Sequence, residues 1–225
     1  MPDWAGPVWD YVLHEGIPNT LRVAAISLVA STLIGVVLGT LLTINWRPSR
    51  MLIRAYVEVF RGLPILVTVF IVYFGLPAVS PQLRYSALDA TAIALILWGS
   101  AQVAEATRGA LQSIPREQRE AASALGFGWI GSQVYVIFPQ GLRRLLPPLV
   151  SLLVNIIQNT TLAGVIGGLE LLSAAQRQNE RVAAVPPIGT GEIHALEIFL
   201  SLAVLFFVIS FPLTRLAAYL EKRLV

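Results

Sequence analysis

Residues 23–44, VAAISLVASTLIGVVLGTLLTI, contain no Asp, Glu, Lys or Arg. A bilayer core of about 30 Å is crossed by roughly 20 apolar residues in a helix, so this run is long enough to span a membrane. Further charge-free runs cover residues 62–83, 90–104, 145–169 and 198–214. The chain of 225 residues is 56% hydrophobic and only 13% charged, whereas soluble domains carry about 25% charged residues. The sequence therefore predicts five membrane-spanning helices.

The predicted fold class is an all-α integral membrane protein with five transmembrane helices in a single domain. A soluble bundle with apolar helices inside would need amphipathic helices on its outside, and few segments here have a polar face. Within the first span, Ser31, Gly35 and Gly39 recur every four residues, a spacing that predicts close packing against another helix. The domain covers residues 1–225, and its predicted spans are 20–44, 63–83, 87–108, 145–169 and 195–217.

The basic residues sort by loop, and this distribution predicts the orientation of the chain. A net charge of +3 and a pI near 9.6 could suggest a nucleic-acid partner, but an excess of Lys and Arg on one side of a membrane explains them better. We therefore expect an extracytoplasmic N-terminus, a cytoplasmic C-terminus, membrane lipid as the surroundings and no nucleic-acid partner. The cytoplasmic side would hold Arg47, Arg50, Arg54, Arg61, Arg108, Arg116, Arg119, Arg143, Arg144, Arg215, Lys222 and Arg223, and the other side Arg22, Arg84, Arg177 and Arg181.

Three segments outside the spans have patterns of their own. Residues 47–60 alternate basic and apolar residues with helical spacing, which predicts a helix in the membrane interface. Residues 170–197 resemble a surface loop with some helix, because they combine charged residues with Pro186, Pro187 and Gly189. Residues 109–144 form the long cytoplasmic segment between the third and fourth spans. The apolar residues of the interfacial segment are Met51, Leu52, Ala55, Tyr56 and Val59.

The cytoplasmic segment is predicted to contain two short helices. Pro115 suits the first turn of the first helix, and the acidic side chains of Glu117 and Glu120 complement its positive end. Gly126 is expected to end this helix, and a second helix over 130–136 is expected to end at Pro139. One face of the first helix would carry Gln118, Ala121, Ala122 and Leu125.

Enzymatic motifs are missing from the sequence, which predicts that the chain is not an enzyme. It contains no phosphate-binding loop, no His-Glu-x-x-His metal pair and no Gly-x-Ser-x-Gly nucleophile. The two histidines, His14 and His194, are expected to be surface residues rather than metal ligands. We therefore expect no metal and no cofactor on this chain, so that any energy from ATP must come from another polypeptide.

The stretches EAASALG at 120–126 and VIFP at 136–139 resemble the EAA loop of ABC importer permeases. In that family this loop forms a short helix that docks into a cleft of the ATPase subunit. Val136 and Phe138 replace the Ile and Leu that are usual in the family motif. The resemblance implies an ATPase-coupling role for Glu120, Ala121, Ala122, Leu125, Gly126 and Pro139.

Three further stretches resemble the polar amino-acid subfamily of these permeases. They are FRGLPILV at 60–67, AEATRGALQSIP at 104–115 and NTTLAGVIG at 159–167. Leu63 stands where the family usually has Thr, and Thr161 where it frequently has Ser. The residues that carry the family motif are Arg61, Gly62, Pro64, Arg108 and Gly109.

The resemblance implies a permease subunit with the type I ABC importer fold, which works by alternating access in the bacterial inner membrane. Its expected partners are a second permease, identical or homologous, two ATPase subunits that hold ATP and Mg, and an extracytoplasmic amino-acid-binding protein. Its expected substrates are polar or charged L-amino acids. Two alternatives stay open from the residues alone: an ion-coupled secondary carrier, and a structural membrane subunit or channel without a pumping role.

Two groups of polar residues inside the spans are candidates for the substrate pathway. A carboxylate at the centre of a span costs roughly 2.5–3.5 kcal/mol, so Glu105 is expected to face a cavity or a partner. It could hold a substrate ammonium, or pair with Arg108 three residues further on. Gln102 lies on the same face, where the family often has Tyr. In the fourth span, a polar stripe could line the pathway or bond to neighbouring helices, and it consists of Asn155, Gln158 and Asn159, followed by Thr160.

Overall fold

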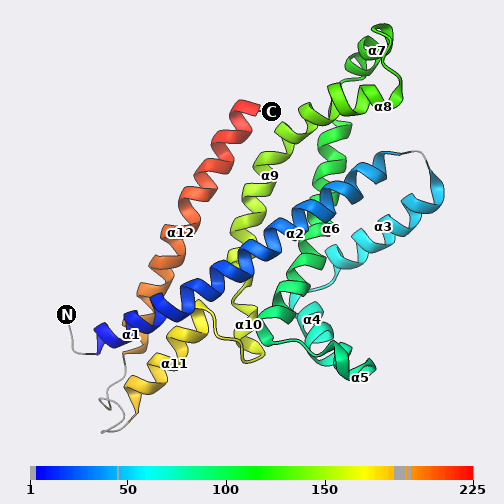
Figure 1. Ribbon diagram of the computed structural model, residues 1–225. Coiled ribbons are helices and arrows are strands. Elements are labelled where there is room, and N and C mark those ends of the chain that lie inside the picture. Colours follow the sequence, from blue (N-terminus) through cyan, green and yellow to red (C-terminus); the bar gives the residue numbers. More distant parts are fainter. Residues whose placement is uncertain (1–3, 45, 185–190, 192–193, 225) are drawn as a thin grey trace. The chain divides into compact units, whose positions relative to one another are not determined.

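The computed structural model describes residues 4–44, 46–184, 191 and 194–224, and within these ranges the chain is helical and has no β-strand. Figure 1 shows long helices joined by short helical segments. The predicted all-α class is therefore confirmed. The long helices are α2 (Ile17–Thr43), α6 (Ala87–Gln112), α9 (Phe138–Asn159) and α12 (Ala195–Leu224). At 1.5 Å per residue, each of these helices is long enough to cross the hydrocarbon core.

By length and composition, four stretches among the described residues qualify as membrane spans, and a bent helix pair brings the number to as many as five. The first stretch begins earlier than predicted, because α1 (Ala5–Tyr11) and a π-helical turn (Val12–Gly16) run directly into α2. The predicted second span, 63–83, qualifies only in combination with α3 (Arg47–Gly62). The four qualifying stretches are Ala5–Thr43, Ala87–Gln112, Trp129–Val165 and Ala195–Leu224.

The predicted second span contains several short helical pieces rather than one long helix. Leu63 has extended backbone after α3, and Pro64 follows it. The pieces that follow are α4 (Ile65–Phe70), a π-helical turn (Ile71–Gly75), α5 (Leu76–Val79) and a 3₁₀ turn (Pro81–Leu83). A residue before proline disfavours the α conformation, which explains why the helix is interrupted at Leu63.

The prediction that Pro139 ends a short helix was wrong. α8 (Trp129–Gly131) continues through a π-helical turn (Ser132–Ile137) into α9, and Pro139 is the second residue of α9. The wider π-helical turn changes the hydrogen-bond pattern just before Pro139, so that its missing N–H does not break the helix. The predicted fourth span, 145–169, is not one helix either. α9 ends at Asn159, and a turn leads into the short helix α10 (Leu162–Val165).

The chain divides into two compact units. The first comprises residues 1–27, 65–95 and 154–212. Its apolar core joins α1 and the following π-helical turn to α11 (Leu171–Ala183) and to the start of α12. The predicted loop 170–197 is thus partly wrong, because α11 buries one face, while Pro186, Pro187 and Gly189 lie outside the described residues. The buried core residues are Val8, Val12, Leu171, Ala174, Ala175, Val182, Ile198 and Leu202.

The second unit comprises residues 28–64, 96–153 and 213–225. In this unit the inner parts of α2 and α6 approach each other closely. A Cβ atom on Gly35 would lie 2.7 Å from Val103 Cγ1, and one on Gly39 would lie 2.5 Å from Thr107 Cβ. Ser31 Oγ donates a hydrogen bond to the Ile96 carbonyl at 3.4 Å. The predicted packing face of the first span is therefore confirmed.

Candidate functional site

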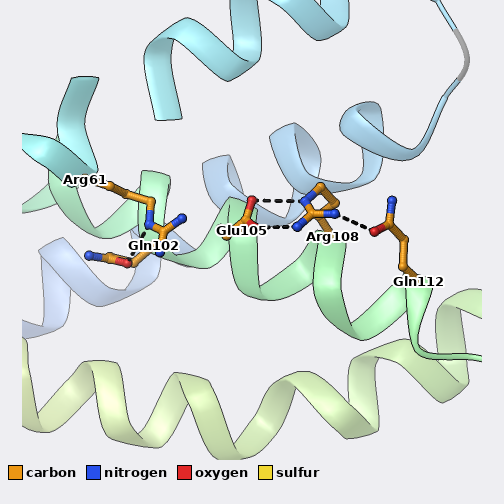
Figure 2. Close-up of polar contacts among 5 residues, drawn as sticks. All are labelled: Arg61, Gln102, Glu105, Arg108 and Gln112. Carbon is orange, nitrogen blue, oxygen red and sulfur yellow. Dashed lines mark hydrogen bonds and ion pairs between the residues drawn. The ribbon is translucent and has the colours of Figure 1, made fainter. Parts of the chain in front are cut away.

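A polar cluster lies on one face of α6 in the second unit. Gln102, Glu105, Arg108 and Gln112 follow each other at three- and four-residue spacing, which places them on the same side of the helix. Figure 2 shows Arg61 reaching from α3 to the first of them. Its Nε donates to Gln102 Oε1 at 3.2 Å. α3 is thus tied to α6 by a contact between two residues of the predicted site.

Glu105 is paired with Arg108 through both of its oxygens. Arg108 Nε donates to Glu105 Oε2 at 3.0 Å, and Nη2 donates to Oε1. Arg108 Nη1 also donates to Gln112 Oε1. Such a bidentate pair is stronger than a single hydrogen bond, because two parallel N–H groups match the two carboxylate oxygens. Of the two roles that the sequence allowed for Glu105, the structure shows the pairing.

A cavity of about 140 Å³ opens beside this pair. Three arginines and two glutamates surround it, so the lining is rich in charge of both signs and has a small positive excess. Arg54 and Glu58 were missed from the sequence. They lie seven and three residues before Arg61, a spacing that places all three residues on one side of α3. This spacing is the signal from which Arg54 and Glu58 could have been found. The lining residues are Leu42, Arg54, Val57, Glu58, Arg61, Glu105 and Arg108.

The predicted polar stripe of α9 lies in the first unit, at the end of the helix. Asn155 and Gln158 are exposed and Asn159 is half-buried. Asn159 Nδ2 donates to the Asn155 carbonyl at 2.8 Å. The hydroxyl of the buried Thr160 donates to the Ile157 carbonyl at 2.7 Å. These two bonds return to the helix itself, so they stabilise its last turn.

α7 (Arg116–Ala124) is the helix of the EAA-like stretch, and Figure 1 shows it next to α8. It begins directly after Pro115. Gly126 ends it with φ +84°, a conformation that side chains with a Cβ rarely adopt. The Gly126 N–H bonds the Ser123 carbonyl and the Phe127 N–H bonds the Ala122 carbonyl, each at 3.0 Å, which together form a Schellman motif. The predicted end of the helix at Gly126 is therefore confirmed.

The predicted face of α7 divides between the interior and the surface. Ala122 is 2% exposed, whereas Leu125 is 79% exposed. Gln118, Glu120 and Ala121 are exposed as well, and Glu120 makes an ion pair with Arg116 at 2.9 Å. Three- and four-residue spacing places Gln118, Ala121, Ala122 and Leu125 on one side of the helix. Of these four residues, Ala122 alone is buried.

Polar contacts hold α7 against its own unit. Arg119 Nη2 donates to the Leu111 carbonyl at 3.1 Å, at the end of α6. Arg144 Nη1, from α9, donates to the Ser113 carbonyl and hydroxyl at 2.8 Å each. Leu111, Ile114 and Ile137 form a small buried cluster beneath these contacts. These contacts join α7 to the end of α6, and the residue after α6 to α9.

The remaining motif residues lie at helix ends or on helix surfaces. Gly62 is the last residue of α3 and Pro64 lies two residues further on, and both are exposed. Gly109 is exposed in the last turn of α6. A Cβ atom on Gly62 or Gly109 would meet nothing within 4 Å, so packing does not require glycine there. Pro139 is exposed on α9.

The two histidines differ from each other. His14 is exposed, and its Nδ1 lies 2.9 Å from the Asp10 carbonyl oxygen. The side chain of His194 is only 17% exposed, and its ring stacks on Trp4 with 4.6 Å between centroids. The surface prediction was thus wrong for His194. No group of three or more His, Asp or Glu residues that could hold a metal ion occurs in the part of the chain that the structure describes.

Glu170 is a buried charged residue that the sequence did not reveal as such. Its carboxylate accepts hydrogen bonds from the N–H groups of Leu172 and Ser173, at 2.8 Å each, and caps α11. The Ser173 hydroxyl in turn accepts from the Glu170 N–H at 2.9 Å. Burial raises the pKa of the Glu170 carboxyl, although these hydrogen bonds partly oppose the shift. The signal was Glu-x-x-Ser, the reverse order of a common capping box.

Two bacterial relatives match nearly the whole chain. The chain is 34% identical over 224 residues to the glutamine transport system permease protein GlnP of Escherichia coli, covering 99% of this chain and 97% of that protein. It is 31% identical over 210 residues to the probable glutamine ABC transporter permease protein GlnM of Bacillus subtilis, covering 93% and 92%.

Solved structures share the fold. An amino acid ABC transporter crystallised with histidines superposes with a TM-score of 0.81 and 26% identity over 99% of both chains. The inward-facing MetNI methionine ABC transporter gives a TM-score of 0.77 at 19% identity over both entire chains. A family model described as binding-protein-dependent transport system inner membrane component matches residues 31–225. This chain belongs to that family of inner-membrane transport components.

Proposed function

We propose that this chain is the permease subunit of an ATP-driven importer that moves polar or charged L-amino acids by alternating access. The chain is an inner-membrane permease of the amino-acid ABC transporter type, as its family and its relatives show. Two relatives are named as glutamine permeases, which supports a polar substrate. ATP and Mg would be held by a separate ATPase subunit. Force would pass in both directions between that subunit and this chain.

The observation that carries the proposal is the outward side of α7. This helix is fixed to α6 through Arg119, yet it leaves Leu125 79% exposed. Ala121, one turn before Leu125, is exposed, and so is the neighbouring Glu120. A rigid helix end with one large apolar side chain, small neighbours and a polar edge suits insertion into a cleft of another protein. We assign this surface to ATPase coupling, together with Ala122 and Gly126, which hold the helix, and Pro139.

The test is a Leu125→Glu variant, assembled with the ATPase subunit and reconstituted in vesicles. We expect binding of the ATPase to weaken about tenfold, because a carboxylate would enter an apolar contact. Leu196→Glu is the matched control, since Leu196 is 77% exposed at the start of α12. Equal ATP-driven uptake by both variants would contradict the coupling role of α7.

The same vesicles separate this proposal from its two rivals. A secondary carrier would accumulate amino acid with this chain alone, driven by an ion gradient. A structural subunit would support no uptake with any partner. We expect uptake only when the ATPase, ATP and the amino-acid-binding protein are all supplied. A second permease, identical or homologous, completes the proposed assembly.

We also propose two groups of residues for the substrate pathway. The first is Gln102 and Glu105 on α6, next to the charged cavity. The second is the polar end of α9, with Asn155, Gln158, Asn159 and Thr160. A carboxylate such as Glu105 attracts an ammonium group, and amides bond both the amino and the carboxylate groups of an amino acid.

A double-mutant cycle tests whether Glu105 contacts substrate or only pairs with Arg108. Glu105→Gln is expected to raise KM for a cationic amino acid about tenfold, the effect of losing one charged contact of about 1.4 kcal/mol. If Glu105 only neutralises Arg108, then Glu105→Gln combined with Arg108→Gln restores KM. Glu58→Gln is the control, because Glu58 is the other carboxylate of the cavity. Restoration by the double variant would contradict the substrate contact.

A further inference from the structure

α3 has three sides of different character: one is buried, one is basic and one is apolar and exposed. Its first side is buried against its own unit and contains Ile53 and Val57, 9% and 4% exposed. Tyr56 extends this side and donates a hydrogen bond to the Leu97 carbonyl at 3.1 Å. One side of α3 is thus fixed to the protein, which leaves the other two sides facing outward.

The second side is basic. Arg47, Arg50 and Arg54 follow at three- and four-residue spacing and line an open groove of about 600 Å³. Met51 and Ala55 line the same groove, so that its basic side adjoins an apolar one. Glu58 lies at the end of this groove, so three cations face one anion. Arg50 turns back and donates to the Ile44 carbonyl at 3.2 Å. The side chains of Arg47 and Arg54 are exposed.

The third side is apolar and exposed. Met51 is 77% exposed, Leu52 is 73% exposed and Val59 is 50% exposed, with the exposed Ala55 between them. Trp46, directly before the helix, is 63% exposed. Tryptophan is enriched at the level of lipid headgroups, where an amphipathic ring contacts both apolar chains and polar groups. A helix with adjacent apolar and basic sides lies in the plane of a membrane interface.

We infer that the basic groove of α3, formed by Arg47, Arg50 and Arg54, binds the headgroup of an anionic phospholipid. The apolar side of the helix would enter the acyl chains of the same leaflet while the arginines hold the phosphate. Arginine suits this role, because its planar guanidinium binds phosphate oxygens through two parallel N–H groups. A soluble polyanion would leave Met51 and Leu52 uncovered, whereas a lipid satisfies both sides.

The lipid contact can be measured without any transport assay. Trp46 is the reporter. Its fluorescence is obtained by subtracting the emission of the Trp46→Phe variant from that of the wild-type chain. Vesicles contain phosphatidylcholine with a small fraction of phosphatidylglycerol, and bromine atoms that quench tryptophan are placed on one lipid or the other. We expect brominated phosphatidylglycerol to quench Trp46 well above its share of the lipid.

The variant Arg47→Gln combined with Arg54→Gln tests the groove. Each arginine near an anionic surface is worth about 1 kcal/mol, which is roughly fivefold in relative affinity. The double variant is therefore expected to lose about 25-fold in preference for phosphatidylglycerol. Arg143→Gln combined with Arg215→Gln removes the same charge at two other exposed positions and is the matched control. This control is expected to keep the preference.

Three results would overturn the inference. Equal quenching by both brominated lipids would show an interface helix without headgroup selectivity. An equal loss in the control pair would show attraction to the net charge rather than to the groove. Protection of Trp46 from both lipids and from aqueous iodide would show that a protein covers this surface. Because none of these readouts depends on uptake, a failed transport proposal leaves the lipid test unaffected.

Discussion

Gly35 and Gly39 determine how closely α2 and α6 pack in the second unit. A Cβ atom on Gly39 would collide with the Ala104 carbonyl and lie 2.5 Å from Thr107 Cβ. Backbone atoms cannot move aside as a flexible side chain can. Lipid offers no hydrophobic force to press two helices together, so small residues that permit close contact take its place.

We predict that Gly39→Ala destabilises the protein by about 1–3 kcal/mol, the usual cost of overpacking a tight contact. The matched control is Gly109→Ala on the exposed side of α6, where a Cβ atom meets nothing within 4 Å. That control is expected to be neutral or slightly stabilising, because alanine is favoured over glycine in a helix by roughly 0.5–1 kcal/mol. Thermal unfolding in detergent, followed by tryptophan fluorescence, measures both. Equal midpoints would contradict the close approach.

Glu170 predicts a pH dependence of stability. Its pKa in the folded chain is raised above the ordinary value of 4.5 by burial. The folded state therefore binds the proton more tightly than the unfolded state, and the stability that protonation contributes is lost as pH rises through the raised pKa. We expect the midpoint of the wild type, relative to Glu170→Gln, to fall from acidic to neutral pH. A difference that rises with pH would mean that the hydrogen-bonded carboxylate is the favoured form.

Two glycines near the end of α7 distinguish the effect of backbone strain from the effect of packing. Gly126 has φ +84° and a Cβ atom there would meet nothing within 4 Å. Gly128, two residues on, is equally open but has φ −67°. We predict that Gly126→Ala disturbs the end of α7 at a cost of about 1–2 kcal/mol and reduces ATP-driven uptake. Gly128→Ala is expected to leave uptake unchanged, and a similar loss in both variants would contradict a role for the Schellman motif.

Local patterns predicted the elements well where a single residue type has one physical meaning. Charge-free runs fell on the long helices, except that the run 62–83 contains only short helical pieces. The small residues of α2 revealed its packing face. Gly126 revealed the end of α7 because glycine is favoured in the left-handed region. Pro139 misled, since its effect depends on the π-helical turn before it. The effect of a proline on a helix thus depends on the hydrogen bonding of the residues before it, which a rule for a single residue does not include.

The candidate site was predicted less completely, because it depends on contacts between distant residues. Sequence spacing showed that Glu105 and Arg108 could pair, and they do. It did not show that Arg61 bonds Gln102, forty-one positions away. It placed Ala122 and Leu125 on one side of α7, but it did not show that Ala122 is buried whereas Leu125 is exposed. Spacing fixes which side of a helix a residue takes, but not what that side faces.

The predicted orientation of the chain in the membrane can be tested directly. The chain contains no cysteine, so single cysteines can be placed at will. Ser123→Cys on α7 and Gln176→Cys on α11 are both at exposed positions. With the N-terminus outside and the C-terminus in the cytoplasm, a membrane-impermeant maleimide should label Gln176→Cys in intact cells. Ser123→Cys should react only after the cells are opened, and the reverse pattern would refute the orientation.

Only 11% of the most apolar window of α12 is buried inside the chain. A newly made copy therefore gains little free energy by docking this last helix onto the earlier ones. We therefore expect its lateral release from the translocon to rely mainly on its own affinity for hydrocarbon. For α12, insertion during synthesis is then expected to precede, and not to require, assembly with partner proteins.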